Sequence, residues 1–532
     1  MTTRHTVVVA DQISADGLAP LADDPRFSLV HRPGLKGDAL AQAIADADAV
    51  LVRSATKITR DSLARADRLK VIGRAGVGVD TIDVEAATER GIAVLTAPSG
   101  NTTSAAELTM ALILSLVRRI PAADRSMKLG EWDRKSFSGS ELRGKTLGLV
   151  GAGRVGSEVA RRAKAFGVRV VAYDPYLTPE RARSVDVELA SLDDVLRTSD
   201  ILSLHVPLTD ATAGLVSAEK LALTRKGVYI VNVARGGVLD EEALERALTE
   251  GHVAGAALDV FEVEPLPADH PLRKLENVVL TPHLGASTAE AQHSVAVEIA
   301  EAVRAALVEG DLSRAVNAPA IGGAEMQRLR PLLGLVERLG VLGVALADGA
   351  VAGVELRYSG AIENALGPLA AASMIGVLTP ALGRATINLV NALHVAQRRG
   401  IAVERVRTDA RRGFVEHVEL RLRTPSGSVR VAGALLGEGH PRITSIDDYQ
   451  VDVLPQGTLV VLRNRDVPGV IGRVGTILGN ASLNIAEYHQ ARQKVGGDAL
   501  AAVSVDGKLA PPVLDALRAI PEVTAVRQAQ LD

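Results

Sequence analysis

The sequence predicts an α/β protein made of several domains, and three observations support this fold class. Short runs rich in Val and Ile alternate with Ala- and Leu-rich segments of helical spacing over residues 5–283, a pattern typical of parallel sheets with crossover helices. A glycine-rich turn, GAGRVG, joins a predicted strand to a predicted helix at residues 151–156. After residue 317 the chain becomes rich in Gly and Ala, with mixed strand and helix signals. A chain of 532 residues is also too long for one hydrophobic core.

The first α/β unit is predicted at residues 5–98, where five apolar runs have the length of strands. A helical pattern, DALAQAIADA, separates two of these runs, as expected for a parallel sheet. The predicted strands are HTVVVAD, FSLVHRP, AVLVRS, LKVIGRA and IAVLTAP.

A second α/β unit begins with the strand in front of the glycine-rich turn. Its predicted strands are TLGLV, VRVVAYDP, ILSLHVPL, GVYIVNVAR, VAGAALDV and VVLTPH. The next stretch, STAEAQHSVAVEIAEAVRAALVEG, begins with Ser and Thr, keeps a helical period and ends in Gly, so it predicts one long capped helix. From residue 458 the order strand, helix, strand, strand, helix, strand predicts a small separate unit.

The composition excludes several classes of protein. The net charge of −3 provides no overall basic field, so neither nucleic acid nor a membrane surface is an expected partner. The sequence has no cysteine, which excludes disulfides, thiolate metal sites and a cysteine nucleophile; we predict no metal site. The apolar runs at the start and at residues 105–117 are too short for a secretory signal or a membrane span, which predicts a cytoplasmic protein.

The glycine-rich turn predicts a dinucleotide site because its flanking strand and helix are both present. Gly151 permits the tight turn, Gly153 lets the backbone approach a pyrophosphate, and Gly156 allows close packing of helix on strand. Asp174 ends the next predicted strand, where a carboxylate binds ribose hydroxyls and repels a 2′-phosphate, so NAD is favoured over NADP. A near-match at residues 73–80, GRAGVGVD, lacks the third glycine. The alternative is a glycine turn with a purely structural role.

Polar residues follow three later strands of the second unit. Arg235 follows GVYIVNVA, Asp259 and Glu264 follow VAGAAL, and His283 follows the last strand. Ligands of open parallel sheets bind outside the carboxyl ends of the strands, so these side chains should converge. His283 is the expected base for a substrate hydroxyl, Glu264 can bind its other ring nitrogen, and Arg235 can hold a carboxylate. His205 in SLHVPL is interpreted as structural.

These motifs carry a resemblance to a known family. GAGRVG, VNVARGGVLDEEAL, ALDVFEVEP and TPHLGAST resemble the D-2-hydroxyacid dehydrogenase family over residues 1–317. The chain is similar to the long-form members that act on phosphoglycerate, through VIGRAGVGVDTIDVEAA, SGNTTSAAE, GEWDRKSF and the C-terminal half.

The resemblance implies four domains. A Rossmann NAD-binding domain is inserted in a flavodoxin-like substrate domain, and an α+β intervening domain and a βαββαβ ACT domain follow. The implied boundaries are residues 1–97 with 286–317 for the substrate domain, 98–285 for the NAD domain, 318–454 for the intervening domain and 455–532 for the ACT domain. Helices near residues 103–118 and 287–308 are the links about which the cleft closes.

The resemblance also implies the site residues. The implied catalytic residues are Arg235, Glu264 and His283, with His283 exchanging the proton. The implied NAD-binding residues are Gly151, Gly153, Arg154, Val155, Gly156, Asp174, Val206, Val233, Ala234, Asp259, Gly285 and Ala286. The implied substrate-binding residues are Arg53, Ser54, Arg74, Asn101 and Arg134. In relatives the residue equivalent to Arg134 can come from the neighbouring subunit, and a charged loop such as EWDRK is usually solvated surface.

The implied reaction is NAD-dependent oxidation of D-3-phosphoglycerate to 3-phosphohydroxypyruvate, the first step of L-serine biosynthesis. A terminal phosphate needs positive charge beyond the arginine that binds the carboxylate, and Arg53, Arg74 and Arg134 are candidates for it. Two alternatives remain open: another D-2-hydroxyacid dehydrogenase, acting on glycerate or a similar acid, and a NAD-sensing corepressor-like protein.

The C-terminal half implies assembly and regulation. By resemblance, the intervening domain packs between subunits, which predicts a homotetramer. Asp466 and Asn484 match effector positions of the ACT domain and imply feedback inhibition by L-serine. Residue 464 is Asn, a departure that leaves one effector contact open, and the alternative is a domain that serves assembly only. The junction DDYQVDVLPQG has no basic residue, so no second anion site is predicted there.

Overall fold

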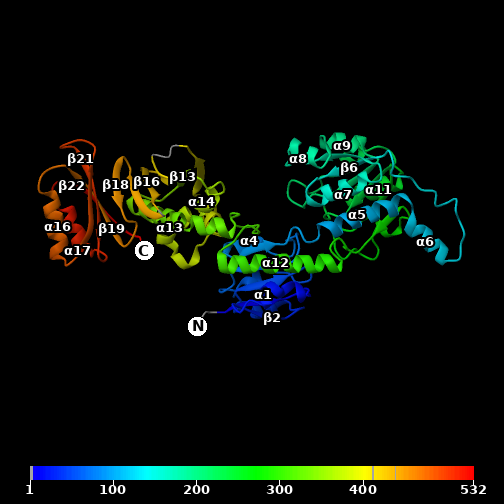
Figure 1. Cartoon of the computed structure of the whole chain (residues 1–532), viewed down its shortest axis with the longest axis horizontal. Coiled ribbons are helices and arrows are strands. Elements are labelled where there is room, and N and C mark those ends of the chain that lie inside the picture. The colour runs from blue at the N-terminus through cyan, green and yellow to red at the C-terminus, as the bar shows by residue number, and fades with distance from the viewer. Residues whose placement is uncertain (1–3, 410–412, 438, 532) are drawn as a thin grey trace.

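The computed structural model describes residues 4–409, 413–437 and 439–531. The chain forms four sheets, and along the long axis of the molecule their order is second, first, third and fourth (Figure 1). The two N-terminal sheets are parallel, the third is mixed and the fourth is antiparallel, which confirms the predicted α/β fold class with smaller units after it. Within the described residues, no helix is both long and apolar enough to cross a membrane.

The first sheet has five parallel strands in the order β2-β1-β3-β4-β5. The strands are β1 (His5–Val9), β2 (Phe27–His31), β3 (Ala49–Val52), β4 (Val71–Arg74) and β5 (Ala93–Thr96). The helices of this part are α1 (Ala19–Ala22), α2 (Gly37–Ala45), α3 (Arg60–Leu63) and α4 (Val84–Glu89), with a 3₁₀ turn at Asp16–Leu18. The strand order reverses between β1 and β3, the usual position of a ligand crevice. We call this sheet with its helices the N-terminal lobe.

The second sheet has seven parallel strands in the order β12-β11-β10-β9-β6-β7-β8. The strands are β6 (Thr146–Val150), β7 (Arg169–Tyr173), β8 (Glu188–Leu189), β9 (Ile201–Leu204), β10 (Val228–Asn232), β11 (Val253–Leu258) and β12 (Val278–Leu280). The helices are α7 (Arg154–Lys164), α8 (Pro179–Ser184), α9 (Leu192–Thr198), α10 (Ala218–Ala222) and α11 (Glu241–Thr249), with a 3₁₀ turn at Pro271–Lys274. This is the doubly wound order of a Rossmann sheet. We call this sheet with its helices the central lobe, a name that refers to its place in the sequence and not to its place in space.

Two long helices connect the lobes, α5 (Thr102–Val117) and α12 (Ala289–Glu309) (Figure 1). Thr288 caps α12 by accepting from the Ala291 N–H, and Gly310 ends it in the left-handed conformation, as its sequence predicted. The Thr288 hydroxyl also lies 2.6 Å from the Ser104 hydroxyl of α5, so the two helices begin side by side. These two helices are therefore the connection between the two lobes.

Helix α12 packs its apolar face on the first sheet. Val303 and Ile299 lie so close to β4 that a Cβ added at Gly73 would be 2.8 Å and 3.0 Å from their side chains. Only glycine therefore fits at residue 73 without moving the helix.

An arm extends from the central lobe after α5. It consists of α6 (Ile120–Lys128) and the loop that leads to β6, and it projects away from both sheets (Figure 1). Large apolar side chains on this arm face solvent, with Leu129 73% and Trp132 79% exposed. Exposed apolar groups gathered in one place are typical of an interface.

The third sheet has six strands in the order β14-β13-β15-β16-β17-β18. The strands are β13 (Gly353–Ser359), β14 (Ala402–Arg407), β15 (Glu416–Thr424), β16 (Gly427–Leu436), β17 (His440–Ile446) and β18 (Tyr449–Val453). The helices are α13 (Gly323–Leu346), α14 (Leu366–Leu382) and α15 (Ala392–Arg398), with a 3₁₀ turn at Arg384–Thr386. Helices α13 and α14 pack on the sheet around the fully buried Tyr358.

The fourth sheet has the order β20-β21-β19-β22. In chain order its elements are β19 (Thr458–Arg465), α16 (Val470–Asn480), β20 (Ile485–Arg492), β21 (Asp498–Val505), α17 (Pro511–Arg518) and β22 (Val523–Gln530), the predicted βαββαβ order. One face of the sheet packs on α16 and α17, whereas Leu459, Val461 and Leu500 on the other face join the core of the third sheet. The last two units therefore share a core and are not joined by a free linker.

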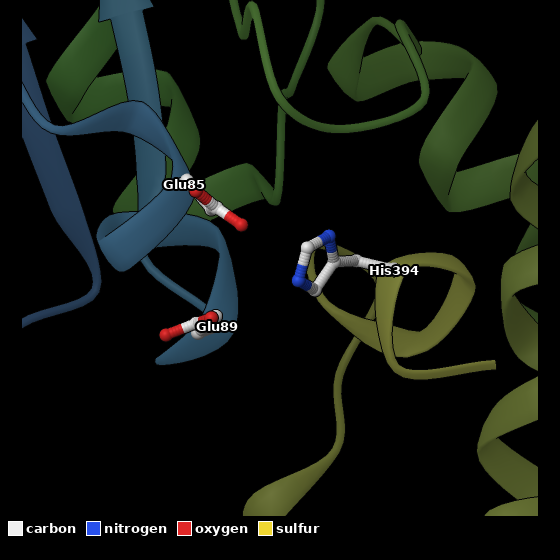
Figure 2. A group of neighbouring side chains, drawn as sticks. All are labelled: Glu85, Glu89 and His394. Carbon is white, nitrogen blue, oxygen red and sulfur yellow. The ribbon is translucent and has the colours of Figure 1, made fainter. Parts of the chain in front are cut away.

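The N-terminal lobe contacts the third unit through α4 and α15. Figure 2 shows His394 of α15 facing Glu85 and Glu89 of α4, and the possible ligand atoms of these three residues lie within 4.8 Å of one another. The two Glu89 carboxylate oxygens are already paired, one with Arg60 and the other with Arg398. Because these guanidinium groups balance the charge of Glu89, we interpret the cluster as a domain contact and not as a cation site.

Candidate active site

The glycine-rich turn between β6 and α7 has the geometry that its three glycines predicted. Gly151 has a φ of +94°, and a Cβ there would lie 2.7 Å from the His205 carbonyl oxygen. A Cβ on Gly156 would lie 2.3 Å from the Gly151 carbonyl oxygen, which explains the need for glycine where helix and strand meet. Around Gly153, by contrast, the space is open to at least 4 Å. A pyrophosphate can therefore approach the backbone at Gly153, at the start of α7, where the helix dipole favours negative charge.

Asp174 follows β7 and contacts the same turn. Its carboxylate accepts from the Ala152 N–H at 3.0 Å through Oδ2 and from the Tyr176 N–H at 2.9 Å through Oδ1. The side chain is half-buried beside the first turn of the dinucleotide site. This position fits a carboxylate that binds the ribose hydroxyls of NAD.

His205 directly follows β9, behind this turn, and its surroundings fit the structural role predicted for it. Its Nε2 lies 2.9 Å from the Ser203 hydroxyl. Burial lowers the pKa of His205 to about 4, because the protein shields the ring from water. A neutral imidazole held in this way is unsuited to exchanging protons near neutral pH.

Glu264 and His283 form a hydrogen-bonded pair at the carboxyl ends of β11 and β12. The Glu264 Oε2 lies 2.8 Å from His283 Nδ1, and the other oxygen of Glu264 accepts from the Phe261 N–H at 3.1 Å. A carboxylate on Nδ1 makes that nitrogen the protonated one and leaves Nε2 to exchange a proton with a substrate. Both side chains are partly exposed, so a ligand can reach them.

Asp259 holds the loop that carries His283. It is fully buried, and its carboxylate accepts from the Thr281 hydroxyl at 2.6 Å and from the N–H groups of Leu284 at 2.7 Å and Gly285 at 2.9 Å. His283 itself has a φ of +57°, which is uncommon for a residue with a side chain. The three bonds to Asp259 stabilise this conformation. Sequence reasoning missed Thr281, which had no signal beyond its place at a strand end.

Asn232 holds the turn that presents Arg235. This buried side chain donates to the Arg235 carbonyl oxygen at 2.9 Å and accepts from the Ala234 N–H at 3.0 Å. It too was missed from the sequence. The available signal was a polar residue at the end of an otherwise apolar strand, since such a residue when buried needs hydrogen-bond partners.

Arg235 faces the N-terminal lobe, where two of the predicted substrate arginines lie. Its Nη1 donates to the Ala234 carbonyl oxygen at 2.6 Å, and its Nε lies 3.5 Å from an Asp80 carboxylate oxygen. Arg53 follows β3 and Arg74 ends β4, at the same edge of the first sheet. Burial and the positive charges of Arg235 and Arg53 lower the pKa of Arg74 to about 10. Arg74 is thus close enough to both Arg235 and Arg53 to be repelled by them.

Arg74 has an additional feature that indicates a ligand. Its Nη1 donates to the Ala75 carbonyl oxygen at 2.7 Å, but its Nε is shielded from water and has no hydrogen-bond partner among the described residues. A buried donor without a partner is costly, and a bound anion would supply the acceptor.

The remaining predicted substrate residues are Ser54, Asn101 and Arg134. Ser54 follows Arg53 and is exposed, and Asn101 precedes α5 without capping it through its side chain. Arg134 lies on the exposed loop after α6, in the arm that extends away from both sheets (Figure 1). A single chain does not bring Arg134 to the arginine cluster, so its predicted role requires a neighbouring subunit.

Comparisons with known proteins identify the domains of this chain. Residues 110–285 match the model of the D-isomer specific 2-hydroxyacid dehydrogenase, NAD binding domain. Residues 328–447 match the D-3-phosphoglycerate dehydrogenase intervening domain, and residues 458–522 match the ACT domain. D-3-phosphoglycerate dehydrogenase of Methanocaldococcus jannaschii is 42% identical over 523 residues, covering 98% of this chain and 98% of that protein.

The chain belongs to the D-3-phosphoglycerate dehydrogenase family. The Bacillus subtilis protein of that name is 41% identical over 526 residues, with 99% of both chains covered. A solved structure of D-lactate dehydrogenase from Aquifex aeolicus, complexed with NAD and lactic acid, has a TM-score of 0.52 and 32% identity, covering 59% of this chain and 100% of that chain. These findings confirm a dehydrogenase with NAD as its cofactor, and the glycine-rich turn and Asp174 fit that group.

In the ACT domain of this family member, the two predicted effector residues lie at opposite ends of the sheet, Asp466 beyond the end of β19 and Asn484 beside its start. Asp466 lies in the loop between β19 and α16, where its Oδ2 accepts from Arg492 at 2.8 Å and from the Gly496 N–H at 3.2 Å. The hydrogen bond from Arg492 holds the pKa of Asp466 below its usual value. Asn484 directly precedes β20 and donates to Asp506 at 3.0 Å.

Asn464, the position that departs from the family pattern, is buried at the end of β19. Its amide N–H donates to the Arg465 carbonyl oxygen at 2.8 Å. Its Oδ1 has no hydrogen-bond partner among the described residues. An unpaired acceptor next to Asp466 can receive a hydrogen bond from a hydroxyl or ammonium group.

Proposed function

We propose that this protein catalyses the NAD-dependent oxidation of D-3-phosphoglycerate to 3-phosphohydroxypyruvate, the first step of L-serine biosynthesis. The observation that carries the proposal is the arginine cluster of Arg53, Arg74 and Arg235, with Arg235 and the Glu264–His283 pair following neighbouring strands of one parallel sheet. A 2-hydroxy acid needs one guanidinium for its carboxylate, and a terminal phosphate needs further positive charge. The full-length relatives named D-3-phosphoglycerate dehydrogenase support the same substrate.

In the proposed reaction the substrate loses a hydride and a proton from its 2-hydroxyl carbon and oxygen. NAD accepts the hydride when bound. His283 takes the hydroxyl proton through Nε2, while Glu264 stabilises the imidazolium that forms. Arg235 binds the carboxylate next to the carbon that is oxidised, and Arg74 with Arg53 binds the phosphate. Ser54 and Asn101 are proposed to add hydrogen bonds to the substrate.

The cofactor is proposed to lie along the carboxyl ends of the second sheet. The glycine-rich turn would bind the pyrophosphate and Asp174 the ribose. Asp259 is proposed to lie near the carboxamide, but its carboxylate is already bonded to the loop at residues 281–285, so its contribution is to hold that loop. The other proposed contacts are Arg154, Val155, Val206, Val233, Ala234, Gly285 and Ala286.

The test of this function is NADH formation by the purified full chain. With D-3-phosphoglycerate the rate at a given low substrate concentration should exceed the rates with D-glycerate and D-lactate at least tenfold, because only the first substrate has a phosphate for the arginine cluster. Equal rates with glycerate would assign the enzyme to a plain 2-hydroxy acid. No NADH with any of the three would contradict the proposal.

The division into domains supports a cleft that closes on the substrate. We propose the substrate domain at residues 1–97 with 286–317, the NAD domain at 98–285, the intervening domain at 318–454 and the ACT domain at 455–532. The adjoining starts of α5 and α12 would be the hinge, and Glu298 of α12 supports it by accepting from the Ser99 and Gly100 N–H groups at 3.0 Å each. Closure would exclude water from the path of the hydride.

A homotetramer is the proposed assembly. The intervening domain is one proposed contact, and the exposed apolar side chains of the arm, including Leu129 and Trp132, are a second. Two different contacts on each subunit can build a tetramer with paired interfaces. Light scattering after size-exclusion chromatography should give four times the 55.6 kDa chain mass, and a stable monomer would contradict this assembly.

L-Serine is the proposed feedback inhibitor, bound by the ACT domain. Both hydrogen bonds that the Asp466 carboxylate accepts from described residues fall on Oδ2, so Oδ1 is the oxygen proposed for the serine ammonium group. The Asn464 Oδ1 is the candidate partner for the serine hydroxyl. Asn484 would bind the carboxylate or ammonium of serine across a paired interface, since an amide both donates and accepts. Binding far from His283 would then lower turnover by favouring an inactive arrangement of domains.

Replacing these residues should weaken inhibition without changing basal turnover. We expect Asp466→Ala and Asn484→Ala each to raise the serine concentration for half-inhibition at least tenfold, because each loses a hydrogen bond to a charged group. Asp515→Ala is the matched control, since Asp515 is an exposed carboxylate of α17 paired with Arg518. Unchanged inhibition in both test variants would place serine elsewhere, and no inhibition of the wild type would leave the ACT domain a role in assembly only.

A further inference from the structure

Asp80 and Arg235 form an ion pair between the two lobes. Asp80 belongs to the loop between β4 and α4 of the N-terminal lobe, whereas Arg235 follows β10 of the central lobe. The Asp80 Oδ2 lies 3.5 Å from Arg235 Nε, with Asp80 62% and Arg235 27% exposed at their side chains. The guanidinium that is proposed to bind the substrate carboxylate therefore has a protein carboxylate beside it.

The surroundings of Arg235 restrict its guanidinium on three sides. Nη1 donates to the Ala234 carbonyl oxygen at 2.6 Å, and Nε faces Asp80. Nη2 lies against Gly78, where an added Cβ would come within 2.3 Å of it and within 2.6 Å of the Asp80 carboxylate. Gly78 thus leaves the space in which the two charged groups meet. A guanidinium binds a carboxylate through two parallel bonds only when its plane is correctly turned, so these contacts bear on substrate binding.

Two carboxylates lie near the arginine cluster, Asp80 and Asp11, and they have different partners. Both carboxylates oppose the lowering of the Arg74 pKa that burial and the nearby arginines cause. The Asp11 carboxylate, however, is used within the N-terminal lobe, where it accepts from the Arg53 N–H at 2.5 Å and from the Thr56 hydroxyl at 2.6 Å. Asp80 is the carboxylate of this group that contacts Arg235.

We propose that Asp80 is a positioning residue that holds the guanidinium of Arg235 in the orientation needed for the substrate carboxylate. Asp80 acts through Arg235 and is not assigned a contact with substrate or NAD. Because the pair joins the two lobes, Asp80 can hold the Arg235 guanidinium only while the lobes lie in the arrangement that the structure shows. The inference rests on the proposed function for one point, the binding of the substrate carboxylate by Arg235.

Steady-state kinetics provide the first test. Asp80→Ala should raise KM for D-3-phosphoglycerate about five- to tenfold, the scale of a partly exposed ion pair together with the lost alignment, and should lower kcat less than threefold. The affinity for NADH should stay at the wild-type value. Asp80→Asn keeps an oxygen acceptor for Nε and should restore most of the wild-type KM. The matched control is Glu85→Ala, which removes an exposed carboxylate from the adjoining α4 and should leave KM unchanged.

Calorimetric titration of D-3-phosphoglycerate into the enzyme–NADH complex provides the second test, because it needs no turnover. Asp80→Ala should weaken binding in the wild-type background and cause no further loss in the Arg235→Ala background. Wild-type affinity in Asp80→Ala, or an equal further loss in the Arg235→Ala background, would overturn the inference. If the wild-type enzyme neither binds nor oxidises D-3-phosphoglycerate, the result contradicts the proposed function alone. The same variants are then compared on the 2-hydroxy acid that the enzyme does oxidise.

Discussion

Replacing His283 with asparagine is expected to lower kcat about 10³-fold, within the range that a positioned acid–base group contributes. Asparagine keeps the size and polarity of the site but cannot accept the hydroxyl proton from the substrate. The Glu264 carboxylate, now 2.8 Å from His283 Nδ1, would lose the imidazolium that it stabilises. NADH binding, measured by fluorescence titration, should change little, since the dinucleotide turn follows β6, which three strands separate from β12 in the sheet.

The matched control for His283 is His270→Asn. His270 is also a histidine beside a glutamate of the central lobe, with its Nε2 3.6 Å from Glu241, but it begins a 3₁₀ turn away from the strand ends. The kcat of the His270→Asn variant should stay within about twofold of the wild-type value, as expected for a residue that does not contact the substrate. If His283→Asn kept the wild-type kcat, another group would have to be the base.

Much of this site was predictable because its parts are local. The strand, the glycine-rich turn and the helix are contiguous at residues 146–164. Gly151 and Gly156 are needed because backbone atoms lie close to them, whereas Gly153 leaves open space for a ligand. Arg235, Glu264 and His283 each follow a strand of one parallel sheet, and parallel strands bring their carboxyl ends to one edge. Their convergence therefore followed from the strand pattern alone, whereas their roles as site residues stay predictions.

The parts that were missed depend on contacts between distant segments or on signals that are too short. Asp80 meets Arg235 only when the two lobes fold against each other, and Arg492 at the end of β20 reaches Asp466 only when β20 lies in the folded sheet. No periodicity in the sequence reports such pairs. Strand β8 was missed because its two residues are too few for an alternating pattern. Thr281 and Asn232 were missed because a single polar residue at a strand end is common without any function.

Replacing Arg74 with alanine is expected to raise KM for D-3-phosphoglycerate about 10²-fold and KM for D-glycerate less than threefold. The first change reflects the loss of charge-assisted hydrogen bonds to a phosphate in a shielded place. The second is small because glycerate has no phosphate and keeps Arg235 for its carboxylate. Arg74→Lys retains the charge but not the two-pronged geometry, so it should fall between the wild type and Arg74→Ala.

Stability and pH separate this role of Arg74 from a structural one. Arg74→Ala should not lower the melting temperature, because the arginine is repelled by Arg235 and Arg53 and its buried Nε has no hydrogen-bond partner in the described part of the chain. The wild-type Arg74 pKa of about 10 means that its positive charge is lost as the pH rises through that value. The ratio of kcat/KM for D-3-phosphoglycerate to that for D-glycerate should therefore fall above about pH 10, and groups shared by both substrates cancel in this ratio. Equal losses for the two substrates, in the variant or at high pH, would remove Arg74 from the phosphate site.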